Sequence, residues 1–442
     1  MDNDSVTDIK ETLMKKIKHA GRTVLALCSA LALLAGCGKA AATNSGSGSM
    51  DSTTSSSAGT LTALDSAAVN AASESDTSGT NSTASAAGST GSAKNESPDP
   101  SSAPATDPPP APESPAAPSE DPAGIDFVST ETSLYTYEQM MTDLSEMAAA
   151  YPDLLTVRSC GTSLDGREIP EAILGNPESA HHILIQASIH AREYINTLVA
   201  MEQIEYFLHH HADGMYADAS YDQLLSYICF HILPMSNPDG VSISQFGPDA
   251  IVNEDLRAGL SDILQNDLNG GRTSGGDSYW TRWKANARGV DLNRNFDAGW
   301  DMYEGVSYPS SDHYKGTSPA SEPETQAILN AADSCNAMIT ISYHSMGGVI
   351  YWDYGSSGEV YDKDYALMSL VSVMTGYAGS SSVQSSQDAA GCSDYFVLVR
   401  GVPSVTIENG YSECPIGIGE YPSIWSANAE LLPALAFAYK NG

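Results

Sequence analysis

The distribution of large apolar side chains confines the folded part of this chain to its carboxyl-terminal region. From Gly38 to about Asp121 the sequence consists mainly of Ser, Ala, Thr, Gly and Pro, and large apolar residues are nearly absent after Leu64 and Val69. Such a segment cannot bury enough surface to offset the entropy of its chain. We therefore expect a disordered tether over residues 37–124, followed by one large domain over residues 125–442.

A short apolar run precedes the tether. Residues 24–35 are too few to span a bilayer, which takes about 20 apolar residues, but they have the length of a signal-peptide core. Lysines and an arginine come before the run, and it ends in Leu34-Ala-Gly-Cys37, which resembles a bacterial lipobox. The resemblance implies a lipoprotein signal peptide over residues 1–36 and diacylglycerol on Cys37. A plain secretory signal, or a buried helix that ends in Cys, is the alternative.

These features predict a location outside the cytoplasm. A lipid on Cys37 would hold the chain on the extracytoplasmic face of the cell membrane. Translation from Met14 would give a more typical signal than translation from Met1, because four acidic residues precede it.

The charge of the chain excludes nucleic acid as a partner. There are 55 acidic residues against 20 Lys and Arg, so the formal net charge is −35, whereas phosphate binding needs a basic face. Most of the acidic excess lies in residues 125–442. We expect a monomer.

Residues 125–442 alternate between apolar runs and helical patterns. Short runs rich in β-branched residues predict buried strands over residues 183–187, 228–233, 338–343 and 402–407. Apolar residues at helical spacing predict helices over residues 137–150, 194–208 and 425–439. Residues 321–324 have capping-box spacing and should open a helix, and residues 237–240 read as a turn. This order indicates an α/β fold with a mixed, mostly parallel twisted sheet and helices on both faces.

Metal-ligand types follow two of the predicted strands. His190 and Glu193 come just after residues 183–187, and His344 comes just after residues 338–343. Each match alone fits a solvated histidine, a surface glutamate or a satisfied core histidine. One Zn²⁺ explains both, because imidazole nitrogen and carboxylate oxygen suit it. Two His and one Glu leave a fourth position for water, which is typical of a catalytic zinc.

A general base is then required, and Glu408 directly follows the strand predicted over residues 402–407. Zinc polarises the substrate carbonyl and lowers the pKa of water toward about 7. We expect Glu408 to take the water's proton and to deliver it to the leaving amine.

With these residues in place, residues 125–442 resemble the zinc carboxypeptidase family of the carboxypeptidase A type. The matching motifs are ordered along the domain and are as follows: Tyr-Pro-Asp at 151–153, Gly-Thr-Ser-Leu-Asp-Gly-Arg at 161–167, Ile-His-Ala-Arg-Glu at 189–193, Asn-Pro-Asp-Gly at 237–240, Gly-Val-Asp-Leu-Asn-Arg-Asn-Phe at 289–296, Ser-Glu-Pro-Glu at 321–324, Ser-Tyr-His-Ser at 342–345 and Thr-Ile-Glu at 406–408. The resemblance implies that His190, Glu193 and His344 bind zinc and that Glu408 is the base.

The resemblance also implies roles for four residues around this centre. Asn293 and Arg294 match the pair that binds a substrate's terminal carboxylate, which Arg can grip bidentately. Arg192 matches a residue that lines the outer subsites. Asp291 matches a carboxylate that orients a zinc-bound histidine, although a simple turn residue is the alternative.

Two departures from the family pattern concern the substrate. The arginine that polarises the scissile carbonyl is replaced by Lys284, which keeps the charge for an oxyanion. The sequence around it resembles the family branch that cuts γ-D-glutamyl–diaminopimelate bonds in cell-wall peptides. The segment over residues 383–392 lacks the family's mobile tyrosine. Ser393 falls at the pocket floor with Asp388 or Asp394 near it, so a cationic or diamino side chain is conceivable.

The sequence thus predicts a zinc metallocarboxypeptidase that acts on peptides. The alternatives are a γ-D-glutamyl-diaminopimelate peptidase acting on cell-wall peptides and a non-catalytic cell-wall binding lipoprotein. Five bases in the active-site segments predict a local basic pocket: Arg192, Arg282, Lys284, Arg288 and Arg294. We also hypothesise a disulfide between Cys392 and Cys414, which flank the strand before Glu408.

Overall fold

A computed structural model of the chain describes residues 126–441. The predicted signal peptide, the tether and Cys37 lie outside these residues. Among the described residues, no helix combines the length and the apolar character needed to cross a bilayer.

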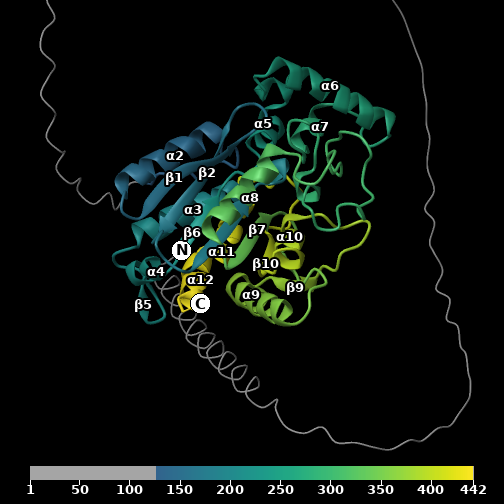
Figure 1. The fold of residues 1–442 in the computed structure, drawn as a ribbon. Helices are drawn as coiled ribbons and strands as arrows, with labels where there is room; N and C mark the ends of the chain where they lie inside the picture. The colour runs from purple at the N-terminus through teal and green to yellow at the C-terminus, as the bar shows by residue number, and fades with distance from the viewer. Residues whose placement is uncertain (1–125, 442) are drawn as a thin grey trace, which may run out of the picture. The chain divides into compact units, whose positions relative to one another are not determined.

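The described residues are organised around an eight-stranded sheet with the strand order β1-β2-β6-β3-β7-β10-β8-β9 (Figure 1). Its strands are β1 (Leu155–Thr162), β2 (Glu168–Gly175), β3 (His182–Ala187), β6 (Cys229–Leu233), β7 (Ile339–His344), β8 (Val349–Trp352), β9 (Ala378–Ser381) and β10 (Ser404–Glu408). Strands β6, β3, β7 and β10 are parallel neighbours, and β8 pairs with β9 in parallel. The other three pairings are antiparallel. The predicted mixed, mostly parallel sheet is confirmed.

Helices cover both faces of the sheet, which is why its central strands are apolar without alternation. On one face, Ile183 and Ile185 pack with helices α2 (Tyr137–Ala150), α3 (Ile195–His209), α4 (Tyr221–Tyr227), α9 (Glu359–Thr375), α11 (Tyr421–Asn428) and α12 (Leu431–Tyr439). On the other face, Leu184 and Leu233 pack with α8 (Pro323–Cys335) and α10 (Cys392–Leu398).

A separate apolar cluster lies at one end of the domain. It is formed by α5 (Pro238–Phe246), α6 (Glu254–Asn269), α7 (Asp277–Thr281) and the buried Trp283. Figure 1 shows α6 and α7 far from α4 and from the small hairpin of β4 (Met215–Tyr216) and β5 (Ala219–Ser220). The cluster packs around Trp283, the residue directly before Lys284.

The prediction of a turn over residues 237–240 is wrong. Asn237 is the N-cap of α5, with its Oδ1 accepting the Gly240 N–H at 3.0 Å, and Pro238 is the first helical residue. Asn and Pro are favoured at these two helix positions as well as in turns, so the local sequence does not distinguish the two structures.

Two further helix predictions need correction. Residues 425–439 do not form one helix, because α11 ends at Asn428 and α12 begins at Leu431. Helix α8 does begin at the predicted place, but without a capping box. Its N-cap is Glu322, which makes no capping bond, and the Ser321 hydroxyl donates to Glu322 Oε1 at 2.7 Å.

Glu324 is a buried carboxyl in the first turn of α8, and it provides a test of this packing. Its Oε2 accepts a hydrogen bond from Asn286 at 3.1 Å, yet burial raises its pKa to about 8. Between about pH 4.5 and pH 8, the Glu324 carboxyl is therefore protonated in the folded protein. In the unfolded chain, where its pKa is near the ordinary 4.5, it is ionised. Stability should fall as the pH rises from about 5 to 8, with a slope of up to about 1.4 kcal/mol per pH unit.

We predict that Glu324→Gln removes this part of the pH dependence, because the amide does not titrate. Urea unfolding at pH 5.5 and pH 8 should show a smaller loss of stability in the variant than in the wild type. An equal loss in both proteins would contradict the assignment.

Candidate active site

Three parallel strands deliver the predicted ligands and the predicted base to one edge of the sheet. Strands β3, β7 and β10 are neighbours, and His344 and Glu408 are paired in register at the ends of β7 and β10. The chain leaves β3 at Ala187 and reaches His190 before the short 3₁₀ helix η1 (Ala191–Glu193). The carboxyl ends of parallel strands meet at one edge, so residues far apart in sequence converge there.

The donor atoms of His190, Glu193 and His344 lie within 4.8 Å of one another. His190 Nδ1 is 2.9 Å from Glu193 Oε1, and His344 Nδ1 is 3.0 Å from both His190 Nδ1 and Glu193 Oε2. All three side chains are buried. The predicted ligand set is therefore assembled in the fold.

The chemistry of this donor set fits a zinc ion. His190 Nε2 lies 3.3 Å from Asp291 Oδ1. The negative charge of this carboxylate favours the tautomer with the proton on Nε2, which leaves the Nδ1 lone pair toward the cluster. Burial raises the pKa of the Glu193 carboxyl, but the charges and hydrogen bonds of His190 and His344 hold it below its ordinary value overall. Two imidazole nitrogens and an ionised carboxylate are the ligand types that zinc prefers.

Asp291 is a completely buried carboxylate that connects several parts of this site. Besides His190, it lies 3.7 Å from Lys284 Nζ and accepts the backbone N–H of His313 at 3.1 Å. Burial alone would raise its pKa, but the Lys284 charge and the His190 contact hold the pKa well below the ordinary value. A permanent negative charge therefore stands behind His190, as in other carboxylate–histidine–metal arrangements.

Backbone contacts attach the Lys284 segment to the ligand segment. The Ala191 N–H donates to the Lys284 carbonyl at 3.1 Å. The Asn237 amide donates to the carbonyls of Ile189 and Ala285, both at 3.1 Å. The Asn237-Pro-Asp-Gly motif thus holds the ligand segment and the Lys284 segment together.

Glu408 ends β10 beside His344 and is only partly exposed. This burial raises the pKa of its carboxyl to about 7, with the His344 charge opposing the rise and the Glu193 carboxylate adding to it. A carboxylate poised near neutrality is suited to accept and return a proton.

Arg294 already has a carboxylate partner in the fold. Its Nη2 lies 2.8 Å from Asp388 Oδ1, and its guanidinium carbon lies 5.2 Å from the centre of the Tyr303 ring. Its side chain is 13% exposed, against 55% for Asp388. The stacking on Tyr303 could not be predicted, because no local motif marks this tyrosine.

Asn293 and the start of α10 are joined by a hydrogen bond. The Cys392 N–H donates to Asn293 Oδ1 at 2.8 Å, which leaves the amide N–H₂ group of Asn293 available to another acceptor. Ser393 is buried and its hydroxyl lies 3.0 Å from Thr406 Oγ1 and 3.3 Å from Ser342 Oγ.

Asp394 is a second acid beside this segment. Burial raises its pKa to about 6, and its Oδ1 accepts a hydrogen bond from Gln384 at 2.7 Å. The two acids named from the sequence therefore occupy different surroundings: Asp388 is exposed and paired with Arg294, and Asp394 is buried in the first turn of α10.

Arg192 lies in η1 between His190 and Glu193 and is partly exposed. Its Nη1 donates to the Arg282 carbonyl at 3.3 Å, and Arg282 in turn pairs with the exposed Glu413 at 3.0 Å. Arg288 points elsewhere and pairs with Glu322 at 2.9 Å. The structure thus pairs several bases of the predicted basic pocket with acids.

The hypothesis of a disulfide between Cys392 and Cys414 is wrong in this fold. All five cysteines of the described residues are free. Cys392, the first residue of α10, belongs to the apolar cluster that α8 and α10 form with the sheet, whereas Cys414 packs against the cluster on the other face of the sheet. The sheet separates the two thiols, although the sequence places them on either side of one strand.

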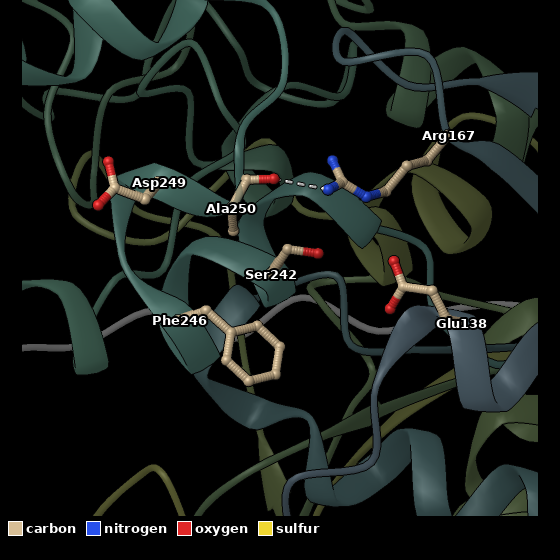
Figure 2. A pocket seen from close by; sticks show the side chains of 6 residues that line it. All are labelled: Glu138, Arg167, Ser242, Phe246, Asp249 and Ala250. Carbon is tan, nitrogen blue, oxygen red and sulfur yellow. Dashed lines mark hydrogen bonds between the residues drawn. The ribbon is translucent and has the colours of Figure 1, made fainter.

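A hollow of about 300 Å³ lies between α2, the β1–β2 turn and α5, and none of the predicted site residues lines it (Figure 2). Arg167 extends across it and donates to the Ala250 carbonyl at 2.8 Å. The same arginine contacts Asp165 at 2.6 Å and Asp239 at 2.9 Å. These bonds tie two of the sequence motifs together, so we assign this region a structural role.

Comparison with known proteins agrees with this geometry. The profile of the family described as "Zinc carboxypeptidase" matches residues 140–408. The chain belongs to the zinc carboxypeptidase family. As a member, it is a hydrolase acting on peptide bonds.

Two relatives illustrate the range within the family. The chain is 30% identical over 294 residues to gamma-D-glutamyl-L-diamino acid endopeptidase 1 of Lysinibacillus sphaericus, with 66% of this chain and 69% of that protein covered. It is 26% identical over 282 residues to carboxypeptidase B of Astacus astacus, with 61% of this chain and 83% of that protein covered.

The fold is also similar to that of a solved structure. The crystal structure of thrombin activatable fibrinolysis inhibitor superposes with a TM-score of 0.55 at 20% sequence identity, covering 70% of this chain and 75% of that one. This likeness concerns the fold alone.

Proposed function

We propose that residues 125–442 form a zinc metallocarboxypeptidase that hydrolyses the peptide bond next to a chain-terminal carboxylate. One observation carries the proposal: the donor atoms of His190, Glu193 and His344 converge at the sheet edge where Glu408 ends β10. Membership of the family supports zinc as the metal.

In this proposal, His190, Glu193 and His344 hold one Zn²⁺. When bound, zinc supplies a Lewis acid that polarises the scissile carbonyl and lowers the pKa of water. Glu408 accepts a proton from that water and later donates it to the leaving amine. Lys284 offers a positive charge to the oxyanion, and Asp291 holds the His190 ring in its orientation.

The substrate would be held by residues around this centre. Arg294 binds the terminal carboxylate through its guanidinium group, and Asn293 contributes its free amide N–H₂ group. Arg192 contacts the substrate on the amino-terminal side of the cleaved bond. Ser393 contributes to the pocket for the terminal side chain.

We predict that Glu408→Gln lowers kcat/KM by about 10²- to 10⁴-fold, which is the usual contribution of a general acid–base residue. The zinc content should stay unchanged, because Glu408 is not a proposed ligand. Hydrolysis of a peptide library, followed by mass spectrometry with and without chelator, measures the effect. Glu359→Gln on the exposed surface of α9 is the matched control and should be fully active. A Glu408→Gln protein as active as wild type would refute the mechanism.

A second candidate, a γ-D-glutamyl-diaminopimelate peptidase acting on cell-wall peptides, is favoured by two observations. One relative carries the name of a γ-D-glutamyl-L-diamino acid endopeptidase. In addition, the exposed Asp388 carboxylate is 2.8 Å from Arg294. A terminal residue with both an ammonium and a carboxylate group would pair its ammonium with Asp388 and its carboxylate with Arg294. Cleavage of stem peptides without release of residues from ordinary peptides would favour this candidate.

The Asp388 contact leads to a prediction about this choice. A terminal ammonium beside Asp388 gains a charged hydrogen bond, worth about 1.5–3 kcal/mol, while a neutral terminal residue gains nothing. Asp388→Asn should therefore lower kcat/KM about tenfold or more for peptides that end in diaminopimelate, relative to peptides that end in leucine. Asp262→Asn, on the exposed side of α6, should leave this ratio unchanged. An unchanged ratio in Asp388→Asn would remove the support for a diamino substrate.

A third candidate, a cell-wall binding lipoprotein without catalysis, predicts no chelator-sensitive cleavage of either library by the wild-type protein. The same digests therefore distinguish all three candidates.

We also propose that lipid on Cys37 anchors the chain to the extracytoplasmic face of the cell membrane and that residues 37–124 are the tether. Cys37→Ser should move the protein from the membrane fraction to the soluble fraction of expressing cells. Cys28→Ser, inside the apolar run, is the matched control and should stay with the membrane. If the Cys37→Ser protein stays in the membrane fraction after its signal peptide has been cleaved, lipid on Cys37 is not the anchor.

A further inference from the structure

A second group of metal-ligand side chains lies at the other end of the parallel strands. His182 begins β3, and Cys229 and His231 lie on β6. In the parallel ladder His182 is paired with Cys229, and Leu184 with His231. Side chains two residues apart share a face of a sheet, so all three project on the face of Leu184 and Leu233, which α8 covers. We call these three residues the β3–β6 cluster.

The donor atoms of the β3–β6 cluster converge as closely as those of the catalytic set. The two imidazole nitrogens and the Cys229 sulfur lie within 4.8 Å of one another. His182 Nδ1 is 2.9 Å from His231 Nε2. Cys229 and His231 are buried, and His182 is partly exposed. An ion could therefore reach the cluster past the His182 ring.

Glu171 on β2 stands behind His231. Its Oε1 lies 2.6 Å from His231 Nδ1, and its Oε2 accepts a hydrogen bond from Arg158 at 2.7 Å. Burial raises the pKa of the Glu171 carboxyl, but His231 and Arg158 hold it below its ordinary value overall. The ionised carboxylate places the His231 proton on Nδ1 and turns the Nε2 lone pair toward His182 and Cys229. A metal-bound histidine commonly has such a carboxylate behind it.

The catalytic set shows the same pattern. There, His190 Nδ1 and His344 Nδ1 are 3.0 Å apart, and Asp291 stands 3.3 Å behind His190. The β3–β6 cluster has two imidazole nitrogens 2.9 Å apart, a carboxylate behind one of them, and a thiol in place of the glutamate. The chain of close polar contacts runs from Glu171 through His231 to His182, and the Cys229 thiol is the further donor that converges on the same point.

We propose that His182, Cys229 and His231 bind a second divalent ion of the zinc type, separate from the catalytic one. Two imidazole nitrogens and a thiolate sulfur are ligands that zinc prefers. Binding converts the Cys229 thiol to a thiolate, so one proton passes to solvent for each ion bound. The site joins the amino ends of β3 and β6, whereas the catalytic residues lie at the carboxyl ends of β7 and β10 or just after that of β3. Its ion therefore stabilises the sheet and does not touch the substrate.

The experiment uses cobalt as a spectroscopic probe, because a thiolate–cobalt bond gives a near-ultraviolet charge-transfer absorption that a His₂Glu site lacks. Metal-free wild-type protein titrated with Co²⁺ should bind two ions per chain and develop this absorption. Cys229→Ser should bind one ion without it. Cys160→Ser is the matched control, because its thiol contacts the Ile169 carbonyl instead, and it should keep both ions and the absorption.

Two further variants assign each cobalt ion to its site. His182→Gln changes a partly exposed residue without opening the core, and it should weaken the cobalt ion that gives the charge-transfer signal by at least about tenfold. His190→Ala should lose the catalytic ion and keep the charge-transfer absorption. Binding of one ion per chain without that absorption, or an absorption that survives in Cys229→Ser, would overturn the proposal. Circular dichroism of each variant verifies that it is folded.

Discussion

The parallel register of β3, β7 and β10 is the constraint on which the rest of this structure depends. Because the three strands point the same way, their carboxyl ends lie at one edge, and the residues that follow them converge there. His190 and Glu408 are more than two hundred residues apart in the chain, with His344 between them, yet one ladder brings the three together. A shift of one residue in this register would turn His344 toward the opposite face of the sheet.

The positive side chains of the candidate site are paired with acidic side chains in the fold. The chain carries a large acidic excess, and the sequence suggests an acidic shell around a basic pocket. In the fold, the site's bases already face acids: Lys284 lies near Asp291, and Arg294 pairs with Asp388. The positive charges of Lys284 and Arg294 are therefore compensated within the fold, and of the two acids that face them only Asp388 is exposed.

Some elements of this fold can be predicted from the sequence, and others cannot. Strands β3, β6, β7 and β10 could be predicted because both of their faces are buried, which makes them short continuous apolar runs. The start of α5 could not, since Asn-Pro-Asp-Gly is equally typical of a turn. The break between α11 and α12 and the separation of Cys392 from Cys414 also depend on packing against the sheet, which no local pattern records.

The sequence by itself determined which residue types stand at the strand ends, and with them the candidate zinc ligands, the candidate base and the family. The tertiary structure decided which of these side chains are neighbours and what charges surround them. It brought Asp291 next to His190 and Asp388 next to Arg294, and it placed the β3–β6 cluster at the opposite end of the parallel strands. The physical reason is that contacts between side chains depend on strand order and register, whereas ligand type and spacing along one segment are local properties of the chain.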